Sequence, residues 1–162
     1  MLTQPLDNQL VIEPARLDDL RFIVEIENTS FSEPWTEKMF KAELTGNQFG
    51  YIFVARPSTG EWERENVFGY ICFWCIFEEL RILNLAVCPK VRRLNIAHQL
   101  VHYSLSFGKS QGTGKGLLEV RSSNTPAMNL YESLGFLEYG RRKDYYNNPR
   151  EDAILMELAS LP

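Results

Sequence analysis

The chain alternates between stretches where apolar residues recur every three or four positions and shorter stretches where they alternate or run together. The first pattern predicts amphipathic helices and the second predicts strands. Helices are expected at 17–28, 36–45, 96–109 and 125–134. Strands are expected at 10–13, 51–55, 67–77, 81–87, 117–121, 136–145 and 152–157.

The order of these elements predicts an α/β domain with a mixed sheet. Strands 51–55, 67–77 and 81–87 follow one another closely, which favours an antiparallel meander. The succession of strand, helix and strand over 81–121 instead predicts a parallel, right-handed crossover. With 162 residues, one domain is expected over 10–162, preceded by a flexible N-terminus at 1–9.

A basic turn joins the strand at 81–87 to the helix at 96–109. It contains Arg92, Arg93 and Asn95. The free N–H groups and the dipole of a helix N-terminus attract anions, so the turn predicts a binding site for a phosphorylated cofactor. The alternative is a short turn with two solvated arginines.

Three polar residues downstream are candidates for chemistry. Period-two alternation places Glu119 on the same strand face as Leu117 and Arg121, where it is either a general base facing a cleft or half of a structural ion pair. Tyr131 lies beside the apolar stripe of the last helix, so it is either a core tyrosine or a catalytic group. Asn124, one residue before the expected cap at Thr125, could be a simple turn residue.

Composition argues against several functional classes. A net charge of −4 disfavours a general nucleic-acid binder, and the longest apolar run, 70–77, is too short to span a membrane. No signal peptide is expected, and an odd count of three cysteines fits a reducing cytoplasm. No metal site is expected. Cys72 and Cys75 should point to opposite strand faces, and His98 and His102 have no evident third ligand.

The chain resembles the GNAT acyltransferases, which use acetyl-CoA, and within them the bacterial enzymes that acetylate the N-terminal alanine of a ribosomal protein. The likeness spans 10–158. It is carried by FSEPWTEK at 31–38, NLAV at 84–87, RRLNIA at 92–97, LEVR at 118–121, Asn124, LYESLGF at 130–136, DYY at 144–146 and REDA at 150–153. It implies a GNAT-like mixed, mostly antiparallel sheet with a central parallel βαβ unit and flanking helices.

The resemblance also implies roles for individual residues. Glu119 matches the family's general base, and Tyr131 matches its general acid toward the leaving thiolate. The pantetheine arm would bind the main chain of Leu85, Ala86 and Val87 and the side chain of Asn124. The pyrophosphate would bind the N–H groups of the following loop: Arg92, Arg93, Leu94, Asn95, Ile96, Ala97 and His98. The peptide entrance would be flanked by Pro34, Trp35, Tyr145 and Tyr146.

One position departs from the family pattern. Asn95 stands where the family has its first glycine. Asn tolerates a positive φ better than other non-glycine residues, so the turn itself is expected to survive.

The expected activity is transfer of an acetyl group from acetyl-CoA to the N-terminal α-amine of a cytoplasmic protein, in particular an N-terminal Ala of a small-subunit ribosomal protein. An α-amine has a pKa near ~8 and a lysine near ~10.4, so deprotonating lysine at neutral pH costs about 3 kcal/mol more. The alternatives are an acetyltransferase for a small amine, such as a polyamine or antibiotic, and a non-catalytic acetyl-CoA-binding module. Neither nucleic acid nor membrane is expected as a partner.

Overall fold

A computed structural model of the chain describes residues 10–58 and 66–162. The predicted flexible N-terminus at 1–9 lies outside these residues, as does the second half of the turn expected at 57–60. The described strands form one seven-stranded sheet in the order β1-β2-β3-β4-β5-β7-β6. They are β1 (Leu10–Pro14), β2 (Gly50–Pro57), β3 (Gly69–Ile76), β4 (Glu79–Val87), β5 (Lys115–Arg121), β6 (Leu137–Tyr146) and β7 (Glu151–Leu158).

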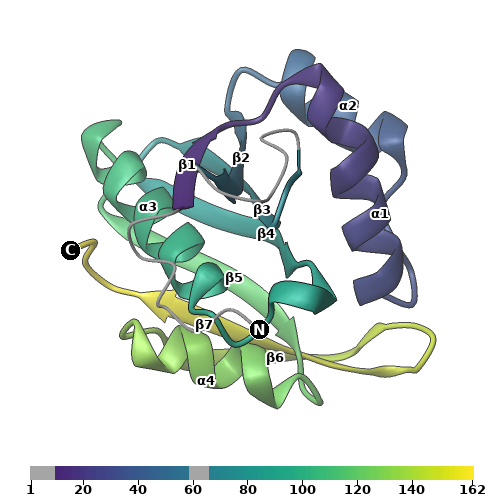
Figure 1. Cartoon of the computed structure of the whole chain (residues 1–162). Coiled ribbons are helices and arrows are strands. Elements are labelled where there is room, and N and C mark those ends of the chain that lie inside the picture. Colours follow the sequence, from purple (N-terminus) through teal and green to yellow (C-terminus); the bar gives the residue numbers. More distant parts are fainter. Residues whose placement is uncertain (1–9, 59–65) are drawn as a thin grey trace.

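Helices cover both faces of the sheet. On one face lie α1 (Leu20–Ser30), which follows a 3₁₀ turn at Leu17–Asp19, and α2 (Glu37–Thr45). On the opposite face lies α3 (Ile96–Ser110), while α4 (Thr125–Ser133) accompanies β5, β6 and β7 (Figure 1). No described helix is long and apolar enough to cross a membrane.

Local sequence explains where the shorter helices begin and end. The hydroxyl of Thr36 accepts the N–H of Met39 at the start of α2, and Gly46 follows its end, as expected. The predicted cap of α4 was wrong by one residue. Asn124 is the cap, with its side-chain oxygen accepting the N–H of Ala127 at 3.3 Å, and Thr125 is the first helical residue. Asn ranks slightly above Thr as a capping residue, and here the backbone becomes helical at Thr125.

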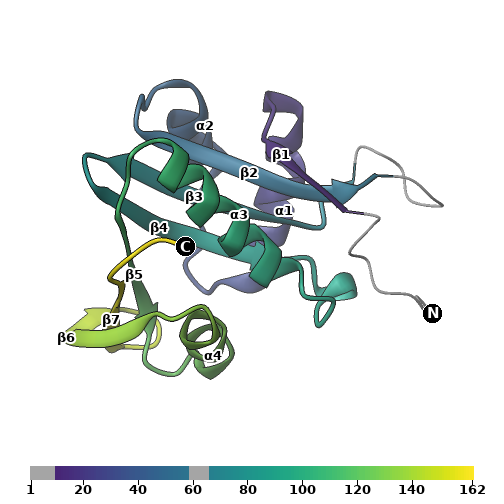
Figure 2. The same cartoon turned by 90° about the vertical axis from the view of Figure 1, so that its left-hand side faces the viewer.

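The predicted topology is confirmed. Strands β1 to β4 form an antiparallel meander, and β4 pairs with β5 in parallel through the α3 crossover. Only residues 79–82 of β4 pair with residues 115–118 of β5. Beyond them the two strands separate, and Figure 2 shows β5, β6 and β7 leaving the plane of the other four strands.

A β-bulge lies where the two strands begin to separate. On β3, the neighbours Phe73 and Cys72 face Ile82 and Asn84, so Leu83 is the extra residue of β4. A bulge bends and twists its strand. The bend therefore begins at the position where β4 parts from β5.

Two apolar cores hold the helices to the sheet. Under α3, the buried cluster includes Phe53, Phe73, Leu100, Leu105 and Phe136. Under α1 and α2, a smaller cluster includes Ile23, Phe40, Tyr70 and Cys72. The alternation along each strand decides which core a side chain joins, so Cys72 and Cys75 lie on opposite faces as predicted.

Candidate active site

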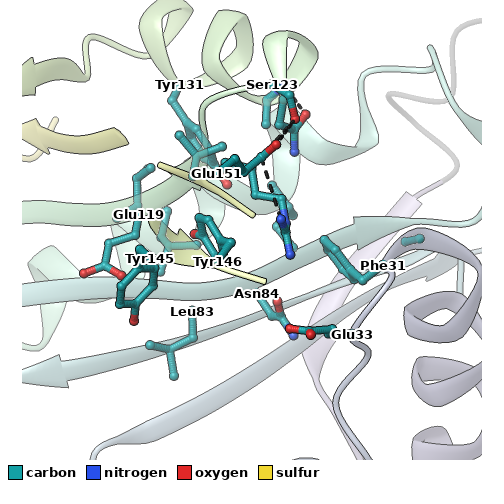
Figure 3. A pocket seen from close by; sticks show the side chains of 18 of the residues that line it. Phe31, Glu33, Leu83, Asn84, Glu119, Ser123, Tyr131, Tyr145, Tyr146 and Glu151 are labelled. Atoms are coloured by element: carbon teal, nitrogen blue, oxygen red, sulfur yellow. Dashed lines mark hydrogen bonds and ion pairs between the residues drawn. The ribbon is translucent and has the colours of Figure 1, made fainter. Parts of the chain in front are cut away.

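The separation of β4 and β5 opens a cleft of about 1000 Å³ on the α1–α2 side of the sheet (Figure 3). Its walls come from segments that are distant in sequence. The lining includes Glu27, Phe31, Glu33 and Trp35 from α1 and the following loop, 81–85 from β4, 117–121 from β5, Asn124, Ala127 and Tyr131 near α4, and Tyr145, Tyr146, Pro149 and Glu151 from the β6–β7 hairpin. The cleft brings Glu119, Tyr131, Asn124, Trp35, Tyr145, Tyr146 and Leu85 together. Pro34 is exposed and lies outside the lining.

The edge of β4 that faces the cleft presents main-chain groups. Cys88 donates its N–H to the carbonyl of Phe68. This bond shows which residues of β4 have main-chain groups that point toward β3. Because the bonding direction alternates along such a pair, the main chain of Asn84 and Ala86 points to β3, while that of Leu85 and Val87 points toward β5. Of the three residues predicted to contact pantetheine, Leu85 and Val87 are therefore the two whose main-chain groups lie on the edge of β4 that faces the cleft.

The loop before α3 has the form of an anion site. Arg93 and Asn95 both lie in the left-handed region, with φ of 64° and 62°. Asn95 makes no side-chain cap, and within the described residues the N–H groups of Ile96, Ala97 and His98 have no acceptor. Left-handed residues beside free helix N–H groups form the kind of nest that binds phosphate oxygens. These donors fit the pyrophosphate of a CoA molecule, and the positive φ predicted for Asn95 is observed.

The side chain of Arg92 turns back toward the sheet. Its Nε donates to the carbonyl of Val87 at 3.1 Å, and its Nη2 donates to the hydroxyl of Ser30 at 3.3 Å. The guanidinium thereby ties the loop to the end of β4 and to α1. Its neighbour Arg93 is exposed.

Glu119 lies on β5 with its side chain 29% exposed in the cleft. Leu118 and Val120, on either side of it, are buried in the α3 core, as the alternation predicts. Oε1 of Glu119 lies 3.3 Å from Nη2 of Arg142, which is itself about half exposed. The ion pair considered from the sequence therefore exists, yet the carboxylate still faces the cleft and can reach a reacting group there.

Tyr131 is buried in the wall of the cleft, with its ring edge-on to Phe136 at 5.7 Å between centroids. Burial raises the pKa of Tyr131 above its ordinary value, and the neighbouring Tyr146 raises it further. The phenol is thus a neutral O–H donor over the whole physiological range. It is a weaker acid than a free phenol, which favours hydrogen bonding to a developing thiolate over full proton transfer.

Arg121 anchors the β6–β7 hairpin over the cleft. Its two Nη atoms donate to the carbonyls of Pro149 and Asn147, each at 2.9 Å, and its guanidinium lies 4.4 Å from the ring centre of Tyr146. Burial and the nearby Glu119 raise the pKa of Tyr146 to about 12. The aromatic wall of the cleft is therefore fixed to the end of β5, two residues after Glu119.

A hydrogen bond joins the two sides of the cleft entrance. The hydroxyl of Ser32, in the loop after α1, donates to the carbonyl of Asn148 in the β6–β7 turn at 2.7 Å. In Figure 3, Phe31 and Glu33 lie at one end of the cleft, and Glu119 and Tyr145 lie at the other. The loop and the hairpin, joined by this bond, both line the cleft.

Sequence reasoning missed a buried polar network on the α1 side of the cleft. Glu27 is 1% exposed and accepts from the N–H of Trp35 at 3.0 Å, from Nδ2 of Asn84 at 3.0 Å and from the hydroxyl of Tyr70. Burial raises the pKa of Glu27 despite these donors. The available signal was Glu27 itself, since a charged residue on the apolar stripe of α1 implies buried partners.

No group of three or more metal-ligating side chains occurs within 10–58 and 66–162. The thiols of Cys72 and Cys75 are protonated at neutral pH, because burial raises the pKa of Cys75 to about 11 and that of Cys72 still higher. The prediction that these cysteines are structural fits their places in the two cores.

Known proteins resemble this chain both in sequence and in fold. The model of the acetyltransferase (GNAT) family matches residues 20–136. The [ribosomal protein bS18]-alanine N-acetyltransferase of Haemophilus ducreyi is 32% identical over 151 residues, covering 91% of this chain and 99% of that protein. Its counterpart from Escherichia coli K12 is 30% identical over 149 residues, covering 91% and 95%. The crystal structure of the Escherichia coli ribosomal-protein-S18-alanine N-acetyltransferase superimposes with a TM-score of 0.81 at 29% identity, over 94% of this chain and 96% of that chain.

Proposed function

Because the chain belongs to the acetyltransferase (GNAT) family, and is therefore an acetyl-CoA-dependent N-acetyltransferase, we propose that its acceptor is the N-terminal α-amine of a protein. The proposed substrate is ribosomal protein bS18 with an N-terminal alanine. Relatives of this chain at about 30% identity are named as alanine N-acetyltransferases of that protein. The observation that carries the proposal is the cleft bridged by Ser32 and Asn148, with Glu119 and Tyr131 among the residues that line it. Ribosomal proteins are made in the cytoplasm, and we place the enzyme there.

Bound acetyl-CoA would supply an activated acetyl thioester. The free N–H groups of Ile96, Ala97 and His98 would hold its pyrophosphate, and the open edge at Leu85 and Val87 would hold its pantetheine arm. Asn124, whose Oδ1 caps α4, keeps its Nδ2 for the same arm. These assignments rest on N–H groups of the loop and of β4 that make no hydrogen bond within the described residues.

Glu119 is the proposed general base. It takes a proton from the α-ammonium group, directly or through one water, and an α-amine with a pKa near ~8 makes this step easy at neutral pH. Tyr131 donates a hydrogen bond to the departing sulfur, and its raised pKa keeps the proton on the phenol oxygen while it does so. Aromatic side chains of Trp35, Tyr145 and Tyr146 line the approach and favour a peptide over a hydrated polyamine.

The test is acetylation of three acceptors by the purified protein, followed as release of free thiol from acetyl-CoA. We expect turnover of a short peptide that begins with Ala and far slower turnover of an N-terminally blocked peptide with an internal lysine or of spermidine. Preference for spermidine would favour the small-amine alternative. Binding of acetyl-CoA with no turnover of any acceptor would leave a non-catalytic module.

A further inference from the structure

The side chain of Asn84 lies at the floor of the cleft, beside the main chain of Leu85. It is half-buried on the α1–α2 face of the sheet, the face toward which Glu119 also points from β5. Its Nδ2 donates to Oε1 of Glu27 at 3.0 Å. Neither Asn84 nor Glu27 has a place in the mechanism above.

Glu27 dictates which way the carboxamide of Asn84 faces. An ionised carboxylate only accepts hydrogen bonds, so the NH₂ end of Asn84 must face it. Oδ1 then lies on the opposite side of the amide group. No described residue donates to this oxygen. It is also absent from the buried polar atoms that lack a partner, so it is accessible to solvent. It is therefore an open acceptor at the floor of the cleft.

Glu27 cannot easily do the same work itself. Oε1 already accepts from both Trp35 and Asn84, and Oε2 accepts from the hydroxyl of Tyr70. With both oxygens occupied and 1% of the residue exposed, Glu27 has no free oxygen for a substrate. Its position fits a role in holding Asn84.

We propose that Oδ1 of Asn84 binds the acceptor α-amine of the peptide, and that Glu27 is the positioning residue that aims it. This inference rests on the proposed function, because it requires a peptide amine in the cleft. A primary amine has two N–H bonds and one lone pair. An acceptor at Asn84 takes one N–H while Glu119 takes the excess proton of the ammonium form, which leaves the lone pair free for the thioester carbon.

The test compares variants of both residues by kcat and KM for an Ala-started peptide, by the Kd of acetyl-CoA and by Tm. Asn84→Ala removes both polar atoms of the amide, whereas Asn84→Thr keeps one hydroxyl that can donate to Glu27, which protects the fold, but lacks the separate oxygen on the opposite side of the amide. We expect each to lower kcat/KM for the peptide about tenfold, the worth of one hydrogen bond, with the Kd of acetyl-CoA unchanged. Asn47→Ala is the matched control, because Asn47 also donates to a glutamate, Glu43, but lies outside the cleft.

Variants of Glu27 separate positioning from catalysis. In Glu27→Gln, the remaining oxygen can still accept from Asn84 and Trp35, so kcat/KM should stay near that of the wild type. Glu27→Ala frees Asn84 and should resemble Asn84→Ala, and the double variant should be no worse than either.

Wild-type kcat/KM in a folded Asn84→Thr protein would overturn the inference, and so would Glu27→Gln being as slow as Glu27→Ala. If the wild type acetylates no peptide, the proposed function fails in that first measurement and the inference fails with it. A defect in the Asn84 variants beside an active wild type is the supporting result.

Discussion

Glu119 and Arg142 form an ion pair of 3.3 Å over β7, between the middle of β5 and the edge strand β6, and both side chains line the cleft. The guanidinium of Arg142 also lies 5.3 Å from the ring centre of Tyr145. Exposed ion pairs contribute only about 0–1 kcal/mol, so Arg142 can move aside at little cost when a substrate amine approaches. The pair is thus compatible with catalysis by Glu119.

Replacing Glu119 with Gln should lower kcat by about 10²- to 10⁴-fold, the usual contribution of a general base. The change is nearly isosteric, and Glu119 contacts none of the proposed pyrophosphate donors, so the Kd of acetyl-CoA should not change. Thiol release and calorimetric titration measure the two quantities. Glu132→Gln, on the exposed side of α4, serves as the control. Unaltered kcat in Glu119→Gln would remove this residue from the mechanism.

Replacing Tyr131 with Phe should lower kcat while preserving the edge-on packing against Phe136. The loss is expected to be about tenfold to a hundredfold, as for one hydrogen bond to a charged group. Burial raises the pKa of Tyr131 above 10, so the wild type should show no loss of kcat from ionisation of this phenol up to about pH 10. A wild-type kcat that falls between about pH 8 and 10, with no such fall in Tyr131→Phe, would contradict this assignment.

Replacing Arg121 with Lys should raise the KM of the peptide several-fold and leave the Kd of acetyl-CoA intact. A lysine cannot bond the carbonyls of Asn147 and Pro149 at once, nor stack on Tyr146, so the hairpin loses its anchor. We also expect the free energy of unfolding to fall by about 1–2 kcal/mol, because Arg121 is only partly exposed. Arg141→Lys, which affects only an exposed pair with Glu138, is the comparison. Equal peptide KM values in the two variants would count against the anchor.

Replacing Asn95 with Gly should leave both folding and acetyl-CoA affinity close to those of the wild type. Asn95 is exposed, has a φ of 62° and makes no capping bond, so its side chain contributes little that glycine lacks. Asn95→Val should destabilise the protein by about 1–2 kcal/mol, because a β-branched residue is strained at positive φ. Urea denaturation and acetyl-CoA titration of both variants provide the measurements. Loss of binding in Asn95→Gly would mean that the Asn side chain itself holds the cofactor.

Glu27 should make stability depend on pH in an unusual direction. Burial raises its pKa above the ordinary value of 4.5, so between these two values the native state keeps a proton that the unfolded chain has lost. Its unfavourable contribution is fully present above the raised pKa and fades as the pH falls through it. The wild type should therefore gain stability relative to Glu27→Gln when the pH is lowered from about 7 toward the ordinary pKa of 4.5. Urea midpoints of both proteins at the two pH values test this, and a change of opposite sign would contradict it.

The sequence predicted the order of the elements and most of their limits, since each helix and strand carries its own periodicity. It also predicted which side chains of β5 face the core: Leu118 and Val120 do, and Glu119 does not. The position of Asn124 was the local error. Two adjacent residues, Asn124 and Thr125, are both good caps, and only the backbone decides between them.

The parts that could not be predicted depend on contacts between distant segments. Glu27 meets Tyr70 and Asn84 across 43 and 57 positions, and Ser32 meets Asn148 across 116. No local pattern records such pairs. The bulge at Leu83 was likewise not predicted, because it depends on the pairing of β4 with β3.

The separation of β4 and β5 also bears on how this protein avoids aggregation. Unpaired main-chain groups of a strand invite pairing with another chain, and most proteins protect the rims of their sheets for this reason. Here the open edge at Leu85 lies inside the sheet, at the floor of a cleft bridged by the Ser32–Asn148 hydrogen bond. Because the unpaired part of β4 lies between two halves of the sheet and not at a rim, another chain could pair with it only by entering the cleft.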